Sequence, residues 1–181
     1  MDDADTFRAL YRAHYRAVCR YLAARTDADA VEDVAAETFV VAWRRLGDVP
    51  EHERPWLLAT AAKCLANHRR SRERSGRLAE RLGAVAATPA ADAVGDALER
   101  AGQRRALLIA LASLGERDRE LLLLAHWDGL APRDVAVVAG CSPVAARARL
   151  HRASRRLQRA LTAALADPEP RRGTAGLTHV A

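Results

Sequence analysis

The sequence predicts an all-α protein built from two small helical bundles that a flexible linker joins. Apolar residues recur at i, i+3 and i+4 spacing through most of the chain, as in amphipathic helices. The sequence lacks the usual signal of a β-hairpin, in which runs of alternating apolar and polar residues are joined by an Asn-Gly or Asp-Gly turn. A stretch rich in Ala and Gly and without aromatic residues, 81–103, divides the chain and is typical of a linker.

Three helices are expected in the first bundle, which takes residues 1–80. A helix over 5–25 follows from one apolar stripe at helical spacing, made by Phe7, Leu10, Tyr11, Tyr15, Val18 and Leu22. A second helix over about 29–46 begins with acidic residues and ends with arginines, which suits the helix dipole. Gly and two prolines in 47–55 predict a loop, and Pro55 opens a third helix that ends in a basic run.

Four helices are expected in the second bundle, which takes residues 104–165. Their apolar periodicity and the breaks between them place the helices at about 104–113, 117–127, 132–139 and 143–165. Tryptophan at helical spacing is more often buried, so we expect Trp43 and Trp127 to belong to the core. The tail, 166–181, contains prolines, glycines and few apolar residues, and we expect it to be disordered.

The last two helices of this bundle have the sequence signals of a helix-turn-helix. Gly140 suits the left-handed position that closes a helix, Ser142 is a good N-cap, and Pro143 is a good first helical residue. Two helices that a tight turn with glycine joins form the DNA-binding motif in which the second helix enters the major groove.

The second helix of this motif has one packing face and one strongly basic face. At 100° per residue an apolar stripe runs through Ala146, Leu150, Ala153 and Leu157, and arginines gather opposite, at Arg149, Arg152, Arg155, Arg156 and Arg159. The tip residues Val144, Ala145, Arg147 and Ala148 are mostly small, so that Arg147 could reach guanine and the methyl groups could touch thymine. A solvated arginine face on a surface helix is the alternative, but cap, turn and tip together favour DNA.

Composition supports a nucleic-acid partner and argues against an enzyme. The formal charge is +6, and all 29 basic residues except Lys63 are arginine. The cysteines form no CxxC pair and the histidines stand at no ligand spacing, so we expect no metal and no cofactor. The sequence contains no nucleophile motif, so we expect no catalytic residues. It has neither a signal sequence nor a long apolar run, so we expect a cytoplasmic protein without a membrane partner.

Both halves of the chain resemble the extracytoplasmic-function (ECF) group of bacterial RNA polymerase sigma factors, which keep only regions 2 and 4. Residues 7–46 are similar to the first part of region 2, and "RPWLLATAAKCLANHRRSRER" is similar to its promoter-reading helix. "LASLGERDRELLLLAHWDGLAPRDVAVVAGCSPVAARARLHRASRRL" is similar to region 4. Both halves occur in the family's order, which is more specific than a helix-turn-helix alone.

The resemblance implies partners and residue roles. Region 2 would bind the clamp helices of the largest subunit of core RNA polymerase through Asp33, Glu37, Thr38 and Phe39. Its loop and third helix would recognise and open the −10 promoter element through Asp48, His52, Trp56, Lys63, Asn67, Arg69 and Arg70. Region 4 would meet the flap of the second-largest subunit and read the −35 element in promoter DNA through Ser142, Val144, Ala145, Arg147, Ala148, Arg149, Arg152, Arg155 and Arg156. The family commonly has an anti-sigma partner, although no residue of this chain identifies one.

Some positions depart from the family pattern. Ala36 stands where the family often has Gln, which weakens the expected clamp contact, and Ala131 replaces the usual Ser or Thr cap before the helix-turn-helix. The alternative function is a stand-alone helix-turn-helix regulator whose first bundle dimerises or senses a signal. The acidic helix beside a strand-opening helix favours the sigma factor, because a dimerising sensor would not need that acidic surface.

Overall fold

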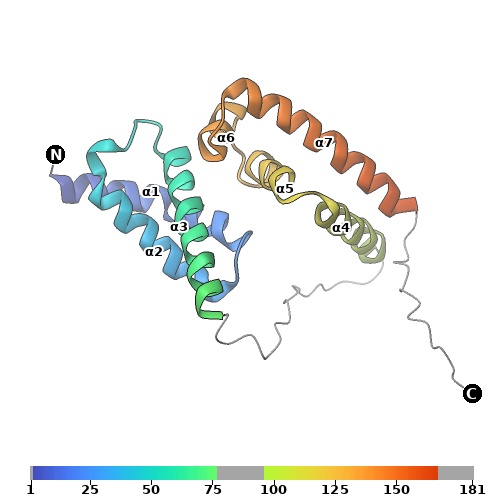
Figure 1. Ribbon diagram of the computed structural model, residues 1–181, viewed down its shortest axis with the longest axis horizontal. Coiled ribbons are helices and arrows are strands. Elements are labelled where there is room, and N and C mark those ends of the chain that lie inside the picture. The colour runs from blue at the N-terminus through green and yellow to red at the C-terminus, as the bar shows by residue number, and fades with distance from the viewer. Residues whose placement is uncertain (1, 77–95, 167–181) are drawn as a thin grey trace, which may run out of the picture.

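The computed structural model describes residues 2–76 and 96–166, and these form seven α-helices with no strand among them (Figure 1). The all-α prediction is therefore confirmed, as is the arrangement of the helices in two groups. The predicted tail lies almost wholly outside the described residues. The predicted linker, 81–103, lies outside them as far as residue 95, and its residues 96–103 are helical.

The first bundle consists of α1 (Asp3–Ala23), α2 (Ala28–Arg44) and α3 (Glu53–Gly76). Each helix packs on the other two, and the predicted apolar stripe of α1 faces their core, with Leu10, Val18 and Leu22 buried. A short 3₁₀ helix, Leu46–Asp48, follows α2. The third helix begins two residues before Pro55, because proline is accepted in the first turn, where no backbone N–H has an intrahelical partner.

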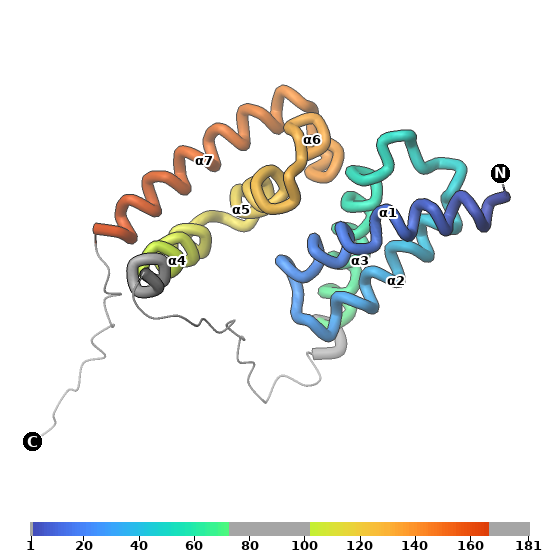
Figure 2. Tube along the Cα trace, turned by 180° about the vertical axis from the view of Figure 1, so that it is seen from behind, coloured from blue at the N-terminus to red at the C-terminus, as the bar shows by residue number. Residues whose placement is uncertain are grey.

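The second bundle consists of α4 (Asp96–Ser113), α5 (Glu116–Leu122), α6 (Pro132–Ala139) and α7 (Pro143–Ala166). The long α7 packs against α4, α5 and α6, and Figure 2 shows it spanning the whole length of this bundle. The first helix starts at residue 96 rather than at the predicted 104. Residues 96–103 contain Ala, Leu, Glu and Arg, which favour a helix, so the composition that predicts a linker ends earlier than we expected.

The helix predicted over 117–127 changes its geometry before it ends. Residues Leu123–Trp127 form a π-helical turn, in which the Asp128 N–H donates to the Leu123 carbonyl over 2.9 Å. The wider turn shifts the side-chain register, so that Leu124 is fully buried while the Trp127 side chain is 60% exposed. Our expectation that Trp127 belongs to the core is therefore wrong.

The two bundles are packed against each other. The helix α3 of the first bundle lies along α6 of the second, as both views show (Figures 1 and 2). One continuous cluster of buried apolar side chains includes Leu57, Leu58 and Leu65 of α3 together with Leu124 and Val135 of the second bundle. The sequence predicts two separate cores, whereas the structure joins them.

Candidate nucleic-acid interface

The helix-turn-helix is formed by α6, a tight turn and α7. Gly140 adopts the predicted left-handed conformation with φ of 62°, and the Cys141 N–H donates to the Ala136 carbonyl over 3.0 Å, as in a Schellman motif. The Ser142 Oγ then accepts the Ala145 N–H over 3.2 Å, so the predicted N-cap is confirmed. Local backbone chemistry therefore fixes where α7 begins.

The two faces of α7 are those that the periodicity predicts. Ala146 and Ala153 are buried, and Leu150 and Leu157 are partly buried against the bundle. The opposite face is exposed and carries Arg147, Arg149, Arg152, Arg155, Arg156 and Arg159. At the tip, the apolar side chains of Val144 and Ala148 are exposed as well, and that of Ala145 is half-buried. An exposed valine on a basic helix face is suited to contact a thymine methyl group.

One arginine of the exposed face already has a partner inside the protein. Arg156 forms an ion pair with Asp118, which lies on α5. Arg156 therefore helps to fix α7 to the rest of the bundle, and it is less available to a phosphate than Arg152 or Arg155. Sequence spacing cannot reveal this pair, because the two residues lie on different helices.

The residues that the resemblance assigns to the −10 element are distributed over the third helix and the loop before it. Lys63, Asn67 and Arg70 are exposed and share one face of α3, where the Arg70 guanidinium donates to the Asn67 side-chain oxygen over 2.6 Å. The carboxylate of Asp48 accepts the Arg45 guanidinium over 2.9 Å. Of the other members, His52 and Arg69 contact Asp134 and Glu116 of the second bundle. Trp56 is half-buried against the shared apolar cluster, so the structure does not gather the whole set on one free surface.

The predicted polymerase-binding residues divide into an exposed and a buried pair. Asp33 and Glu37 are exposed on α2. Thr38 is buried, and its hydroxyl donates to the Val34 carbonyl over 2.7 Å, while Phe39 is buried against the aromatic rings of α1. Only the acidic pair therefore presents side chains on the surface of α2.

Aromatic side chains of α1 and α2 form a cluster that the sequence analysis does not predict as a unit. Phe7, Tyr11 and Tyr15 are spaced four residues apart on α1, and this spacing is the signal that could have revealed the cluster. Trp43 packs edge-on against Phe7 with 5.1 Å between ring centroids, yet its side chain is 48% exposed. Our expectation that Trp43 belongs to the core is thus wrong. A hydrogen bond with Cys19 is the main cause that raises the pKa of Tyr15 to about 12.

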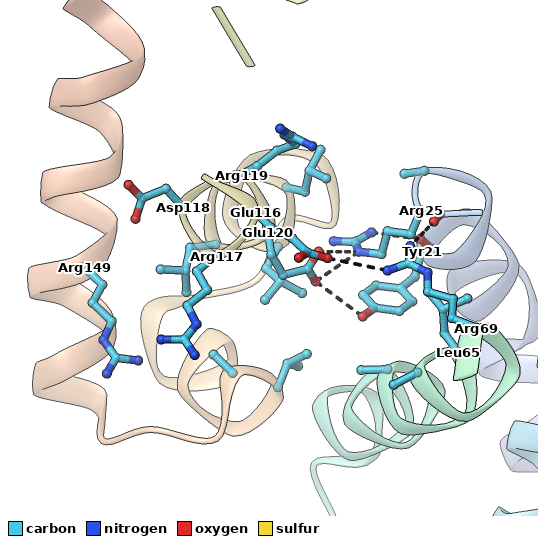
Figure 3. Close-up of a pocket in the computed structure, with 18 of the residues that line it drawn as sticks. Tyr21, Arg25, Leu65, Arg69, Glu116, Arg117, Asp118, Arg119, Glu120 and Arg149 are labelled. Atoms are coloured by element: carbon cyan, nitrogen blue, oxygen red, sulfur yellow. Dashed lines mark hydrogen bonds and ion pairs between the residues drawn. The ribbon is translucent and has the colours of Figure 1, made fainter. Parts of the chain in front are cut away.

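A largely buried polar cluster, which we call the interbundle cluster, consists of Tyr21, Arg25, Arg54, Glu120 and Asp128. Figure 3 shows its members Tyr21, Arg25 and Glu120. The Arg25 guanidinium donates through Nε to both carboxylate oxygens of Glu120, over 3.0 and 2.9 Å, and through Nη2 to Asp128 over 2.8 Å. Burial raises the pKa of Asp128, and the neighbouring Arg25 opposes that shift. Sequence reasoning missed this cluster completely.

The groove beside the interbundle cluster carries more arginines than carboxylates, since Glu116, Asp118 and Glu120 also line it. Arg69 of the first bundle and Arg117, Arg149 and Arg152 of the second line a cavity of about 920 Å³ between the bundles. Within the described residues no three His, Cys, Asp or Glu side chains converge in a group that could hold a metal ion. None of the described helices is both long enough and apolar enough to span a membrane.

Comparison with known proteins identifies the family. The family described as "Sigma-70, region 4" matches residues 104–157, which contain α5, α6 and most of α7. The ECF RNA polymerase sigma factor SigL of Mycobacterium tuberculosis is 30% identical over 162 residues, which cover 86% of this chain and 89% of SigL. The chain belongs to the ECF RNA polymerase sigma factors. The resemblance of both sequence halves is thereby confirmed.

Further relatives agree with the ECF sigma factor assignment. The probable RNA polymerase sigma factor RfaY of Xanthomonas campestris pv. campestris is 38% identical over 138 residues, which cover 73% of this chain and only 34% of RfaY. Two solved structures share the fold. CnrH, in complex with the cytosolic domain of CnrY, has a TM-score of 0.56 at 23% identity and covers 87% of this chain and 88% of its own. The sigma factor RpoE of Bartonella quintana, in complex with the anti-sigma factor NepR, has a TM-score of 0.54 at 24% identity and covers 87% and 92%.

Proposed function

We propose that this ECF sigma factor binds core RNA polymerase and directs it to promoters that carry matched −10 and −35 elements. The observation that carries the proposal is the capped, basic helix α7 of a helix-turn-helix, in a chain whose relatives along most of its length are ECF sigma factors. The protein supplies no catalysis of its own in this proposal, since the polymerase makes the RNA. Its place of action is the cytoplasm, where bacterial RNA polymerase meets DNA.

We assign the −35 element to the tip and the exposed face of α7. The small exposed side chains of Val144 and Ala148, with the half-buried Ala145, let the backbone of the helix tip approach base edges, where Arg147 is long enough to reach a guanine. The N-cap Ser142 precedes this tip and fixes its direction. The remaining basic residues contact phosphates, which gives affinity without sequence preference: Arg149, Arg152, Arg155 and, after release from Asp118, Arg156.

We assign the −10 element and the polymerase contact to the first bundle, within residues 1–80. Lys63, Asn67 and Arg70 form the free basic and polar face of α3, which suits a single strand. Trp56, at the start of the same helix, offers a flat ring on which an unstacked base can rest. The exposed carboxylates of Asp33 and Glu37 bind the clamp helices, and the second bundle, within 104–165, meets the flap.

A partner that controls this sigma factor fits the proposal. The solved structure of RpoE of Bartonella quintana, which has the same fold, contains that sigma factor bound to the anti-sigma factor NepR. We propose that a protein of the same class binds this chain, because two bundles with separate functional surfaces can be blocked together.

The experiment is transcription in vitro with purified core polymerase. The wild-type protein should give initiation from one start site on a matched promoter, and core polymerase alone should not. Tight duplex binding by the free protein together with no association with polymerase would instead identify a stand-alone regulator.

Two arginine variants separate base reading from phosphate contact. Arg147→Ala should change the preferred base at one position of the −35 element, at a cost of about 1–3 kcal/mol for the lost contact. Arg155→Ala, its matched control further along the same exposed face, should weaken all sequences alike and reduce the salt dependence. Both are measured by competition binding on a library of −35 sequences. Equal loss on all sequences for Arg147→Ala would make Arg147 a phosphate contact.

A further inference from the structure

The interbundle cluster joins the two bundles through a charge that is almost completely buried. The Arg25 side chain, just beyond the end of α1, is 5% exposed, and that of its partner Asp128 is 1% exposed. Both carboxylates that hold the guanidinium, Glu120 and Asp128, belong to the second bundle. Burying a charge is costly unless it is paired, so this contact exists only where the two bundles meet in one specific way.

The first bundle prepares Arg25 for this contact. Its Nη1 donates to the Tyr21 carbonyl over 2.8 Å, and its guanidinium carbon lies 3.8 Å from the centre of the Tyr21 ring. The Tyr21 hydroxyl in turn donates to Glu120 over 3.3 Å. Arg54, from the start of α3, donates to the Asp128 carbonyl. The cluster is therefore a geometrically specific joint and not a chance surface ion pair.

Apolar packing and two outer contacts complete the same interface. Leu57, Leu58 and Leu65 of α3 share one buried cluster with residues of α5 and α6. On one side, the His52 Nε2 lies 3.1 Å from the Asp134 carboxylate of α6. On the other side, Arg69 donates to the Arg25 carbonyl and lies 3.6 Å from Glu116.

These contacts occupy two of the residues that the resemblance assigns to the −10 element. His52 and Arg69 belong to the set assigned to the −10 element, and in this structure both are engaged with the second bundle or with the joint. The promoter elements also lie too far apart for the packed bundles. Their names place them about 25 base pairs apart, which is about 85 Å of duplex at 3.4 Å per base pair. Helices α3 and α6 are in direct contact.

We propose that the free sigma factor holds itself in a closed, inactive arrangement in which Arg25, Glu120 and Asp128 latch the two bundles together. The proposal rests on the proposed function, because inactivity here means that the −10 and −35 surfaces cannot engage one promoter. No second protein is needed for this closure. Polymerase and DNA then have to separate the bundles, which breaks the pairs of Arg25 with Glu120 and Asp128 and the contact of Arg69 with Glu116.

The test uses the intact chain and a charge reversal in the latch. In Glu120→Arg a cation faces Arg25, and the side chain of Glu120 is 34% exposed, so the second bundle can accommodate the change. The matched control is Asp3→Arg, a change of an exposed acid to arginine in the first turn of α1, at the end of that helix away from Arg25. Glu120→Gln is the milder second variant. Circular dichroism checks that all variants keep the helicity of the wild type.

Two measurements are made on each variant. Small-angle X-ray scattering of the free protein should show the wild type and Asp3→Arg compact, Glu120→Arg expanded and Glu120→Gln between them. Binding to core polymerase should tighten in Glu120→Arg, because a closed state that is about 90% populated weakens the apparent affinity about tenfold. The expected gain is therefore up to about tenfold, and the control should show none.

The possible results are distinct. Equal scattering of the wild type and Glu120→Arg would overturn the latch, and so would equal expansion in Asp3→Arg. Expansion of Glu120→Arg without tighter polymerase binding would overturn the inhibitory role. A wild type that binds no polymerase at any concentration contradicts the proposed function instead, and the scattering result then still decides whether the bundles are closed.

Discussion

At the residue scale, Asp128 shows how the cost of burying a carboxylate between the bundles opposes its attraction to Arg25. Its carboxylate is buried with one oxygen bonded to Arg25, while its Oδ1 has no partner. Burial raises its pKa, and Arg25 lowers it less than burial raises it. Replacing a buried ion pair by well-packed apolar residues is often neutral or stabilising, so the pair is by itself weak evidence for stability. We expect the apolar contacts around it to supply most of the free energy that holds the bundles together.

The raised pKa of Asp128 predicts a pH dependence with a definite sign. A carboxyl group whose pKa is higher in the folded than in the unfolded state binds its proton more readily when folded. Its ionised form therefore costs stability at neutral pH, and this cost shrinks as the pH falls from the raised pKa toward the ordinary value of 3.8. We expect the free energy of unfolding of the wild type, minus that of Asp128→Asn, to rise on acidification.

Urea denaturation of both proteins at a series of pH values measures this difference. Subtracting Asp128→Asn removes the titration of all other carboxyl groups from the comparison. A difference that falls on acidification would mean that Arg25 outweighs burial and that the pKa of Asp128 is lowered.

The residues also show where prediction from sequence ends. The roles of Ser142 and Gly140 could be predicted because their partners are three to five residues away along the backbone. Arg25 could not be assigned, since its partners Glu120 and Asp128 lie in another bundle and no local pattern connects them. Arg156 is similar, because its ion pair with Asp118 depends on how α5 packs on α7.

At the scale of elements, the helix-turn-helix is the part whose backbone conformation depends most on its own neighbouring residues. The turn between α6 and α7 has a left-handed glycine, a serine cap and a proline in succession, each in the position that its backbone preference favours. The end of α5 is the opposite case. There the π-helical turn exists because burial of Leu124 and the contacts of Asp128 decide the register, and no sequence rule for helices predicts such a turn.

Removing the cap of α7 tests how much that element depends on it. Ser142→Ala deletes the oxygen that accepts the Ala145 N–H, so we expect a loss of about 0.5–2 kcal/mol in the free energy of unfolding. The control is Ser154→Ala, on the exposed face in the middle of the same helix, where alanine is the better helix former and no loss is expected. Chemical denaturation followed by circular dichroism gives both values. Equal stabilities of the two variants would show that the cap contributes nothing.

At the scale of the whole molecule, the single apolar cluster across both bundles is the decisive feature. Regions that share buried side chains unfold together, whereas bundles with separate cores unfold independently. The sequence predicts the two bundles and their order correctly, because amphipathic periodicity is local. The sequence does not predict that the two bundles pack on each other. The apolar residues at their contact belong to the same helical stripes that face each bundle's own core, so no separate pattern reveals the contact.

The shared cluster predicts one cooperative unfolding transition for the intact chain. With Trp43 and Trp56 of the first bundle replaced by Phe, the fluorescence of Trp127, which belongs to the second bundle, should change together with total helicity when urea is added. Leu124→Ala, which leaves a cavity in the shared cluster, should shift that single transition by about 2–5 kcal/mol. Two transitions, one seen only by fluorescence, would show that the bundles unfold separately.

The position of α2 bears on the order in which this sigma factor would bind polymerase and promoter DNA. That helix packs on α1 and α3, and its acidic side chains Asp33 and Glu37 stay in contact with water while the latch is shut. Under the proposed function, polymerase can therefore bind the acidic side chains of α2 first and separate the second bundle from the first afterwards. In that scheme a promoter would be recognised only by a sigma factor that is already bound to polymerase.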